Sequence, residues 1–202
     1  MFNNFRALIG ALALATVLTG GASAAAAQTI GQTNSSFAFG NSQQGQSFTA
    51  TATGTVTQIA IRPSTSVTGD TLRFYNGSNG TNVNGSYGTP ITSQTVNTVA
   101  VANDSAPLQN ITLSTPLSVV AGSTYSFVFA STELRISNSN TYVGGTWTYN
   151  YNQPYPDSDA AFQVTQVVPT SVPTMSEWAM ILLGVTLAGG ATIYIQRRRL
   201  IA

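Results

Sequence analysis

The chain has 202 residues, and only 6% of them are charged, compared with roughly 25% in an ordinary soluble domain. It contains neither cysteine nor histidine, which excludes disulfide bridges, the commonest ligands of zinc, copper and iron, and catalysis by Ser-His-Asp or Cys-His groups. The seven basic residues are all arginine, and the formal net charge is +1.

The first 27 residues have the pattern of a secretory signal peptide. Arg6 supplies a positive charge, residues 7–18 are apolar, and residues 22–27 are small. Two cleavage sites fit, one after Ala27, which we favour, and one after Ala24. The alternative is an uncleaved N-terminal anchor, and the short apolar run argues against it. The sequence therefore predicts export, with signal peptidase as the first partner.

Residues 28–171 are predicted to form one all-β domain. Polar and apolar residues alternate in short runs, and no stretch longer than ten residues has a helical period. In one run, Ile59 and Ile61 are expected to face the core, and Val56 and Ala60 the opposite face. The predicted strands are residues 46–50, 55–62, 71–76, 91–101, 108–113, 116–119, 124–129, 147–151 and 161–167. Short strands at regular spacing favour a β-sandwich or a barrel.

Four segments carry a resemblance to the jelly-roll modules of bacterial secreted and surface proteins. They are Gln46 to Thr49, Leu72 to Gly77, Leu113 to Phe127 and Asp159 to Phe162. Gly122 is expected to allow the turn before Tyr125, and Tyr125 and Phe127 to face the core. The resemblance implies a jelly-roll-like β-sandwich, and it speaks to fold more than to function.

Removal of both terminal segments would reverse the sign of the net charge. Four arginines lie in those segments, and the domain keeps three arginines against five carboxylates, a net charge of −2. These eight residues are Arg62, Arg73, Arg135, Asp70, Asp104, Glu133, Asp157 and Asp159. A slightly acidic domain without lysine has no electrostatic surface for nucleic acid, so we expect no nucleic-acid partner.

Aromatic residues are concentrated near the end of the domain. Exposed rings stack on sugar faces, so this region predicts contacts with an extracellular polysaccharide. The alternative is that Trp147, Tyr149 and Tyr151 alternate on one strand and pack the edge of the sandwich. The candidate glycan contacts are Tyr142, Trp147, Tyr149, Tyr151 and Tyr155.

Carboxylates provide the remaining options for chemistry. Asp157 and Asp159 are the candidate ligands of a structural calcium ion, which prefers oxygen donors, and an Asp-rich turn is the alternative. Without calcium we expect no cofactor. Glycoside hydrolysis needs only two carboxylates, but no pair stands out by spacing or context, so we expect that the protein is not an enzyme.

The C-terminal 31 residues, 172–202, have three parts. A short motif, 172–178, precedes an uncharged apolar run, 178–195, and a basic tail, 196–202. Eighteen helical residues span roughly 27 Å, close to the thickness of the hydrocarbon core of a bilayer. The arginines Arg197, Arg198 and Arg199 are expected to hold the C-terminus in the cytoplasm.

The motif consists of Val172, Pro173, Thr174, Met175, Ser176, Glu177 and Trp178. Together with the helix and the arginines it resembles the IPTL-CTERM sorting signal of Gram-negative bacteria, in which Ile and Leu usually stand at the first and fourth motif positions. The resemblance implies cleavage near the motif by an exosortase-type membrane protease or transpeptidase. The alternative is a permanent C-terminal anchor.

These features predict an exported protein that is anchored in the inner membrane as a precursor. The mature form is expected at the cell surface or outside the cell, with a structural or adhesive role. A glycan-binding surface module is the alternative, and a glycoside-acting enzyme is a second one.

Overall fold

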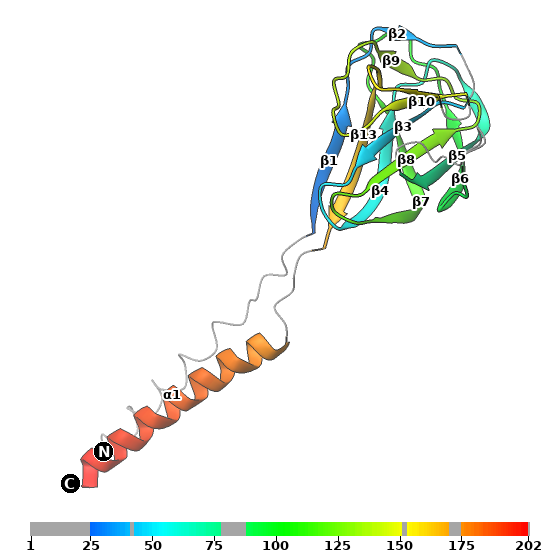
Figure 1. Ribbon diagram of the computed structural model, residues 1–202. Coiled ribbons are helices and arrows are strands. Elements are labelled where there is room, and N and C mark those ends of the chain that lie inside the picture. The colour runs from blue at the N-terminus through cyan, green and yellow to red at the C-terminus, as the bar shows by residue number, and fades with distance from the viewer. Residues whose placement is uncertain (1–24, 41–42, 78–87, 151–152, 170–174, 202) are drawn as a thin grey trace, which may run out of the picture. The chain divides into compact units, whose positions relative to one another are not determined.

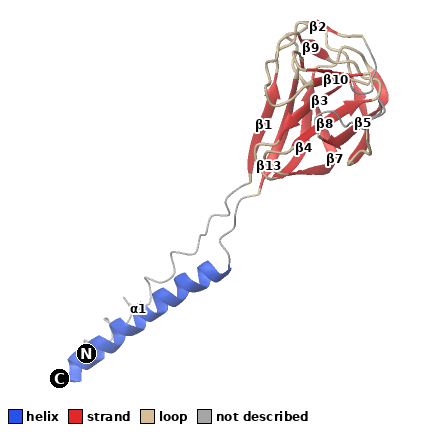
Figure 2. Ribbon diagram, viewed as in Figure 1, coloured by secondary structure: helices blue, strands red, loops and turns tan. Residues whose placement is uncertain are grey.

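The computed structural model describes residues 25–40, 43–77, 88–150, 153–169 and 175–201. They belong to two units, a β domain of Ala25–Pro169 and a unit that contains the helix α1, Met175–Ile201. All sheets are antiparallel, and α1 is the one α-helix in the described residues (Figure 2). The prediction of an all-β domain followed by an apolar C-terminal helix is confirmed.

Two larger sheets and one small sheet build the β domain (Figure 1). The four-stranded sheet contains, in spatial order, β1 (Ala26–Gln32), β13 (Phe162–Val168), β4 (Gly54–Ile61) and β7 (Gln109–Val119). The six-stranded sheet contains β11 (Gln153–Tyr155), β10 (Trp147–Tyr149), β3 (Gly45–Thr49), β8 (Thr124–Phe129), β5 (Val67–Asn76) and β6 (Thr92–Thr98). The small sheet contains β12 (Asp159–Ala160), β9 (Arg135–Ser137) and β2 (Phe37–Ala38).

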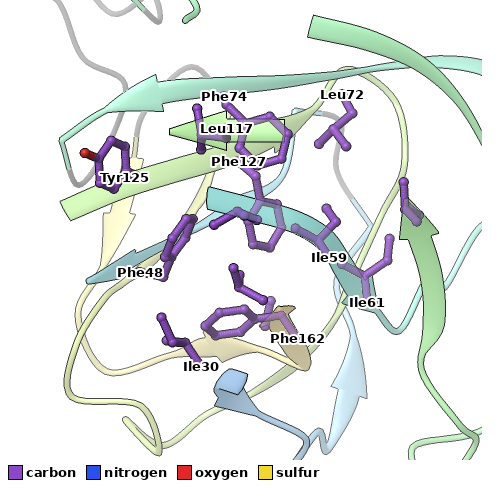
Figure 3. Close-up of a cluster of buried hydrophobic side chains, with 14 of the residues drawn as sticks. Ile30, Phe48, Ile59, Ile61, Leu72, Phe74, Leu117, Tyr125, Phe127 and Phe162 are labelled. Atoms are coloured by element: carbon purple, nitrogen blue, oxygen red, sulfur yellow. The ribbon is translucent and has the colours of Figure 1, made fainter. Parts of the chain in front are cut away.

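The two larger sheets share one hydrophobic core, as in a sandwich (Figure 3). Ile59 and Phe162 belong to the four-stranded sheet, Phe127 to the six-stranded sheet, and all three are fully buried. The ring centroids of Phe127 and Phe162 lie 5.8 Å apart. Tyr125 and Phe127 face this core as predicted, and Gly122 has a φ of 76°, a conformation that favours glycine. The more specific jelly-roll resemblance stays a prediction.

One predicted side-chain orientation is wrong. Val56 was expected on the face opposite to Ile59 and Ile61, but all three residues are buried in the core. In the pairing of β4 with β13, Val56 and Gln58 lie opposite the consecutive residues Gln166 and Thr165, so β4 carries one extra residue here, a β-bulge. A bulge adds one residue to the strand and so reverses which side chains face the core.

The two predicted strands 108–113 and 116–119 are one long strand, β7. Its pairing with β4 is interrupted between Thr112 and Leu117, and Pro116 lies in this unpaired stretch. Proline has no backbone N–H and could not donate a hydrogen bond to the neighbouring strand. The side chain of Gln94 on β6 occupies this gap. It donates to the Thr112 carbonyl oxygen at 3.2 Å and accepts from the Ser114 backbone N–H at 2.7 Å. These bonds link β6 and β7, the edge strands on one side of the sandwich.

β1 begins beside the end of β13. In the antiparallel pair of β1 and β13, Ala26 lies opposite Val168, and Gln32 lies opposite Phe162. We call the side with Ala26 and Val168 the terminal end of the domain, and the side with Gln32 and Phe162 the distal end. In Figure 1, β2 and β9 lie at the end of the β domain opposite to the start of β1 and the end of β13.

The position of β1 bears on signal-peptide cleavage. Cleavage after Ala27 would remove the first two residues of β1, which pair with Val167 and Val168, whereas cleavage after Ala24 would keep the whole strand. We therefore expect the exported protein to begin at Ala25. N-terminal sequencing of the protein recovered outside the inner membrane tests this, and a start at Gln28 would contradict it.

Candidate functional site

A short hairpin carries the aromatic residues at the distal end. Its two strands, β10 and β11, extend the six-stranded sheet beyond β3, with Trp147 opposite Gln46. The Trp147 backbone N–H donates to the Ser158 carbonyl oxygen at 3.1 Å. The Gln46 side chain accepts from the Ala160 N–H at 2.9 Å, and the Gln32 side chain donates to the Ala160 carbonyl oxygen. These bonds fix the hairpin beside the start of β13, away from the chain ends.

Four rings form what we call the aromatic cluster: Phe39, Trp147, Tyr149 and Tyr155. Each contact has ring centroids 4.9–5.3 Å apart, with Phe39 and Tyr155 each packed against Trp147 and Tyr149. Trp147 is 1% exposed and forms the base of the cluster, whereas Tyr155 is 39% exposed. The Tyr149 and Tyr155 hydroxyls are hydrogen-bonded at 2.8 Å, and this bond, with partial desolvation, raises the pKa of Tyr155.

The structure narrows the predicted set of glycan contacts. Trp147 is too deeply buried for its ring to stack on a sugar in this conformation. Tyr142 packs its ring edge-on against Phe162 and accepts a hydrogen bond from the Thr49 backbone N–H at 3.0 Å, so it supports the fold. Tyr151 lies outside the described residues. Tyr155 is exposed and Tyr149 is half-buried, so these two are the remaining candidates for a contact with sugar.

Phe39 was not predicted as part of this site. It precedes Trp147 by more than a hundred residues and belongs to a segment with no clear alternation, so no sequence signal joined it to the cluster. The glycine before the hairpin has a clear role: a Cβ atom at Gly145 would clash with the Ser47 carbonyl oxygen. This close approach lets the segment before β10 pack against β3.

The two predicted calcium ligands have different environments. Asp157 is exposed, whereas Asp159 is 1% exposed. The Asp159 carboxylate accepts from the Gln46 side-chain amide at 3.0 Å and from the Tyr142 backbone N–H at 2.8 Å. N–H donors point positive charge at the oxygens that a cation would use. Within the described residues no group of three or more Asp and Glu side chains is placed to hold a metal, and the calcium site stays a prediction.

Asp159 gives the domain an expected pH dependence. Burial raises the pKa of its carboxyl, although the hydrogen bonds from Tyr142 and Gln46 lower it in part. The folded chain then keeps this proton to a higher pH than the unfolded chain, so the stabilisation is complete below pH 3.8 and is lost as the pH rises through the folded-state pKa. We expect Asp159→Asn to abolish that loss, measured by urea unfolding over a pH series. Asp157→Asn is the control, and the same flattening in both variants would contradict the assignment.

Two other carboxylates that were available for acid–base catalysis hold loops together. Asp70 accepts from the backbone N–H groups of Thr71, Ser131 and Thr132 and from the Thr132 hydroxyl at 2.6–3.0 Å. Asp104 pairs with Arg135 at 3.1 Å and accepts from the Ser35 hydroxyl at 2.9 Å. Both have structural partners that account for their positions.

The C-terminal helix is longer than predicted. α1 covers Met175–Ile201 instead of residues 178–195, so the second half of the motif forms its first turn. Glu177 in the first turn and Arg198 and Arg199 in the last turn complement the helix dipole, which accounts for the extension at both ends.

The part of α1 from Met180 to Arg199 is long and apolar enough to cross a membrane. Twenty helical residues span about 30 Å, the thickness of the hydrocarbon core. The hydroxyls of Thr186 and Thr192 donate to the carbonyl oxygens of Leu182 and Ala188, so neither needs a partner from solvent. Near the end, the Arg198 guanidinium lies 5.5 Å from the centroid of the Tyr194 ring.

In a comparison with known families, residues 170–199 match the model of the IPTL-CTERM motif. The C-terminal tail is an IPTL-CTERM sorting signal. No curated protein matches the chain. The family model covers the tail alone, so it carries no information on the β domain.

The IPTL-CTERM signal indicates in general terms how the protein is exported and processed. It implies a membrane-anchored precursor, processing by an exosortase-type enzyme and sorting through the C-terminus towards the cell surface. Of its motif residues, Val172, Pro173 and Thr174 lie outside the described residues, and Glu177 and Trp178 are exposed at the start of α1. The three arginines that were expected to hold the C-terminus in the cytoplasm, Arg197 to Arg199, lie in the last two turns of α1.

Proposed function

We propose that the mature protein is a non-enzymatic structural or adhesive component of the cell surface or extracellular matrix. The observation that carries this proposal is the polarity of the β domain. Ala26 and Val168 are paired at the terminal end, and the aromatic cluster lies at the distal end. A domain held through its C-terminus therefore carries its exposed aromatic side chains at the end remote from the attachment point.

Fractionation and an attachment assay test this role together. The native strain is compared with a strain that lacks the protein and with one that carries the Tyr149→Ala, Tyr155→Ala double variant. We expect the mature protein in the surface and matrix fractions, and weaker attachment of cells both without the protein and with the double variant. Normal attachment in the deletion strain would contradict the adhesive role.

A glycan-binding module is the second candidate function. The surface rings of Tyr149 and Tyr155 favour it, since they rest on a rigid base of buried aromatic residues and sugars stack on such rings. Their hydroxyls bond to each other at 2.8 Å, so each ring has a fixed position.

Binding to purified extracellular polysaccharide tests this candidate. We expect Tyr155→Ala to weaken the pull-down, because it removes an exposed ring without opening the buried core. Tyr142→Phe is the matched control, since it alters a tyrosine that faces the interior and should leave binding unchanged. A glycan array without signal, or equal binding of both variants, would exclude this candidate.

A further inference from the structure

Tyr149 and Tyr155 form a close pair of phenols at the surface. Their ring centroids lie 5.0 Å apart with an interplanar angle of 31°, and their hydroxyl oxygens are 2.8 Å apart. In the β10–β11 hairpin, Tyr155 lies opposite Trp147, and Tyr149 follows two residues along the same face. Tyr155 is 39% exposed, so a reagent in solution reaches the pair.

We propose that Tyr149 and Tyr155 are an oxidative coupling site, at which a peroxidase and hydrogen peroxide join the two rings as an intramolecular dityrosine. Each phenol loses one electron and one proton and becomes a phenoxyl radical, whose unpaired electron spreads to the ring carbons beside the oxygen. Two such carbons form a Cε–Cε bond, and their hydrogens move to the oxygens to restore both aromatic rings. Hydrogen peroxide takes up the two electrons and two protons and becomes two molecules of water.

The geometry of the pair supports this reaction in two ways. The hydrogen bond between the hydroxyls brings together the ring edges that carry the reacting carbons. The packing of both rings against Trp147, at centroid distances of 5.2 Å and 5.3 Å, restricts their rotation away from each other. Coupling between neighbouring radicals on one chain therefore has an advantage in proximity over coupling between two chains.

Other tyrosines of the β domain are less suited to the reaction. Tyr75 is 3% exposed and Tyr125 is 6% exposed, so both are shielded from an enzyme in solution. The Tyr142 hydroxyl accepts a bond from the Thr49 N–H, and its ring faces Phe162. Among the described residues, Tyr149 and Tyr155 are the one pair of tyrosines joined through their hydroxyls.

The link would have a structural consequence in this protein. The chain has no cysteine, so disulfides cannot stabilise it outside the cell. A bond between residues 149 and 155 closes the hairpin covalently and restricts the unfolded chain in the way that other cross-links do. It would fix the exposed part of the aromatic cluster in one arrangement.

The test uses the full chain in detergent, treated with a haem peroxidase and hydrogen peroxide. Trypsin then releases residues 136–197 as one peptide, because no Arg or Lys lies between Arg135 and Arg197. We expect this peptide to be lighter by two hydrogens, to fluoresce as dityrosine and to give no fragment ions from breaks between residues 149 and 155. The yield should not depend on protein concentration.

Phenylalanine variants assign the site. Tyr149→Phe and Tyr155→Phe keep the rings but lose the phenol, and each should lower the fluorescence to that of untreated protein. Tyr75→Phe and Tyr151→Phe are the controls and should react like the native chain. The proposal is overturned if Tyr155→Phe couples normally, if the link maps to Tyr151, or if only covalent dimers form. If either variant fails to fold, the fragment ions of the native peptide decide.

Discussion

Phe162→Ala is expected to lower the free energy of unfolding of the β domain by about 3–5 kcal/mol, the range for truncation of a buried phenylalanine. The Phe162 side chain is fully buried, and its ring centroid lies 5.8 Å from that of Phe127 and 5.2 Å from that of Tyr142. It therefore touches both the six-stranded sheet and the segment that leads to the aromatic hairpin. Loss of the ring leaves a cavity in the hydrophobic cluster that contains Phe162 (Figure 3).

Urea unfolding of residues 25–169, followed by circular dichroism, measures this effect. Thr165→Ala is the matched control: it lies three residues along the same strand with a half-buried side chain outside the core, and we expect a change within about 0.5 kcal/mol. Equal destabilisation by both substitutions would contradict the central position of Phe162. A domain of this kind has a total stability of roughly 5–15 kcal/mol, so the expected loss is large.

The sequence predicted the strands with a strong local apolar pattern. β13 buries alternate side chains at its start, whereas β8 buries every residue from Tyr125 to Phe129, and both were found within one residue of their observed ends. β1, β2, β9, β11 and β12 were not predicted. In β1 only Ile30 and Gln32 are buried, and its first residues are alanines that also fit a signal-peptide cleavage site. A strand whose partner lies at the other end of the chain has no local signal beyond this weak pattern.

The candidate site was predicted only in part for a similar reason. The aromatic residues concentrated between 142 and 155 predicted a site for sugar contacts, but the local alternation of residues could not separate buried rings from exposed ones. Which of these rings are buried depends in part on Phe39, which packs against Trp147 and Tyr149 from a distant part of the chain. In Tyr142 the hydroxyl points to the backbone of Thr49 on β3, another long-range contact. Tertiary partners decide which aromatic residues remain available to a ligand.

The tail was predicted more completely because its signal is local. Composition alone identifies an apolar run of membrane length that ends in three arginines, and the IPTL-CTERM match agrees with it. The length of the helix was underestimated, since the charged residues at both ends were counted as flanks although they stabilise the helix ends. The tail thus contains the sorting signal, and the β domain contains the candidate site.

Termination of the chain after Pro169 is expected to move the protein from the membrane fraction to the soluble fraction. This truncation keeps every strand, since β13 ends at Val168, and it removes α1, which carries the one span of membrane length in the described residues. A span of about 20 apolar residues anchors a chain almost irreversibly, so nearly all of the precursor should shift. Fractionation with carbonate-washed membranes measures the change.

Two further variants separate anchoring from sorting. Pro173→Ala keeps α1 but alters the motif, so we expect an unprocessed precursor that stays in the membrane. Replacement of Arg197, Arg198 and Arg199 by glutamine keeps the apolar span but removes the charges that hold the C-terminus in the cytoplasm, so a fraction of the chains should insert with the wrong orientation. If the Pro173→Ala precursor were soluble, α1 would not be the anchor. If the native protein kept its arginine tail at the cell surface, the tail would be a permanent anchor and processing by an exosortase-type enzyme would be excluded.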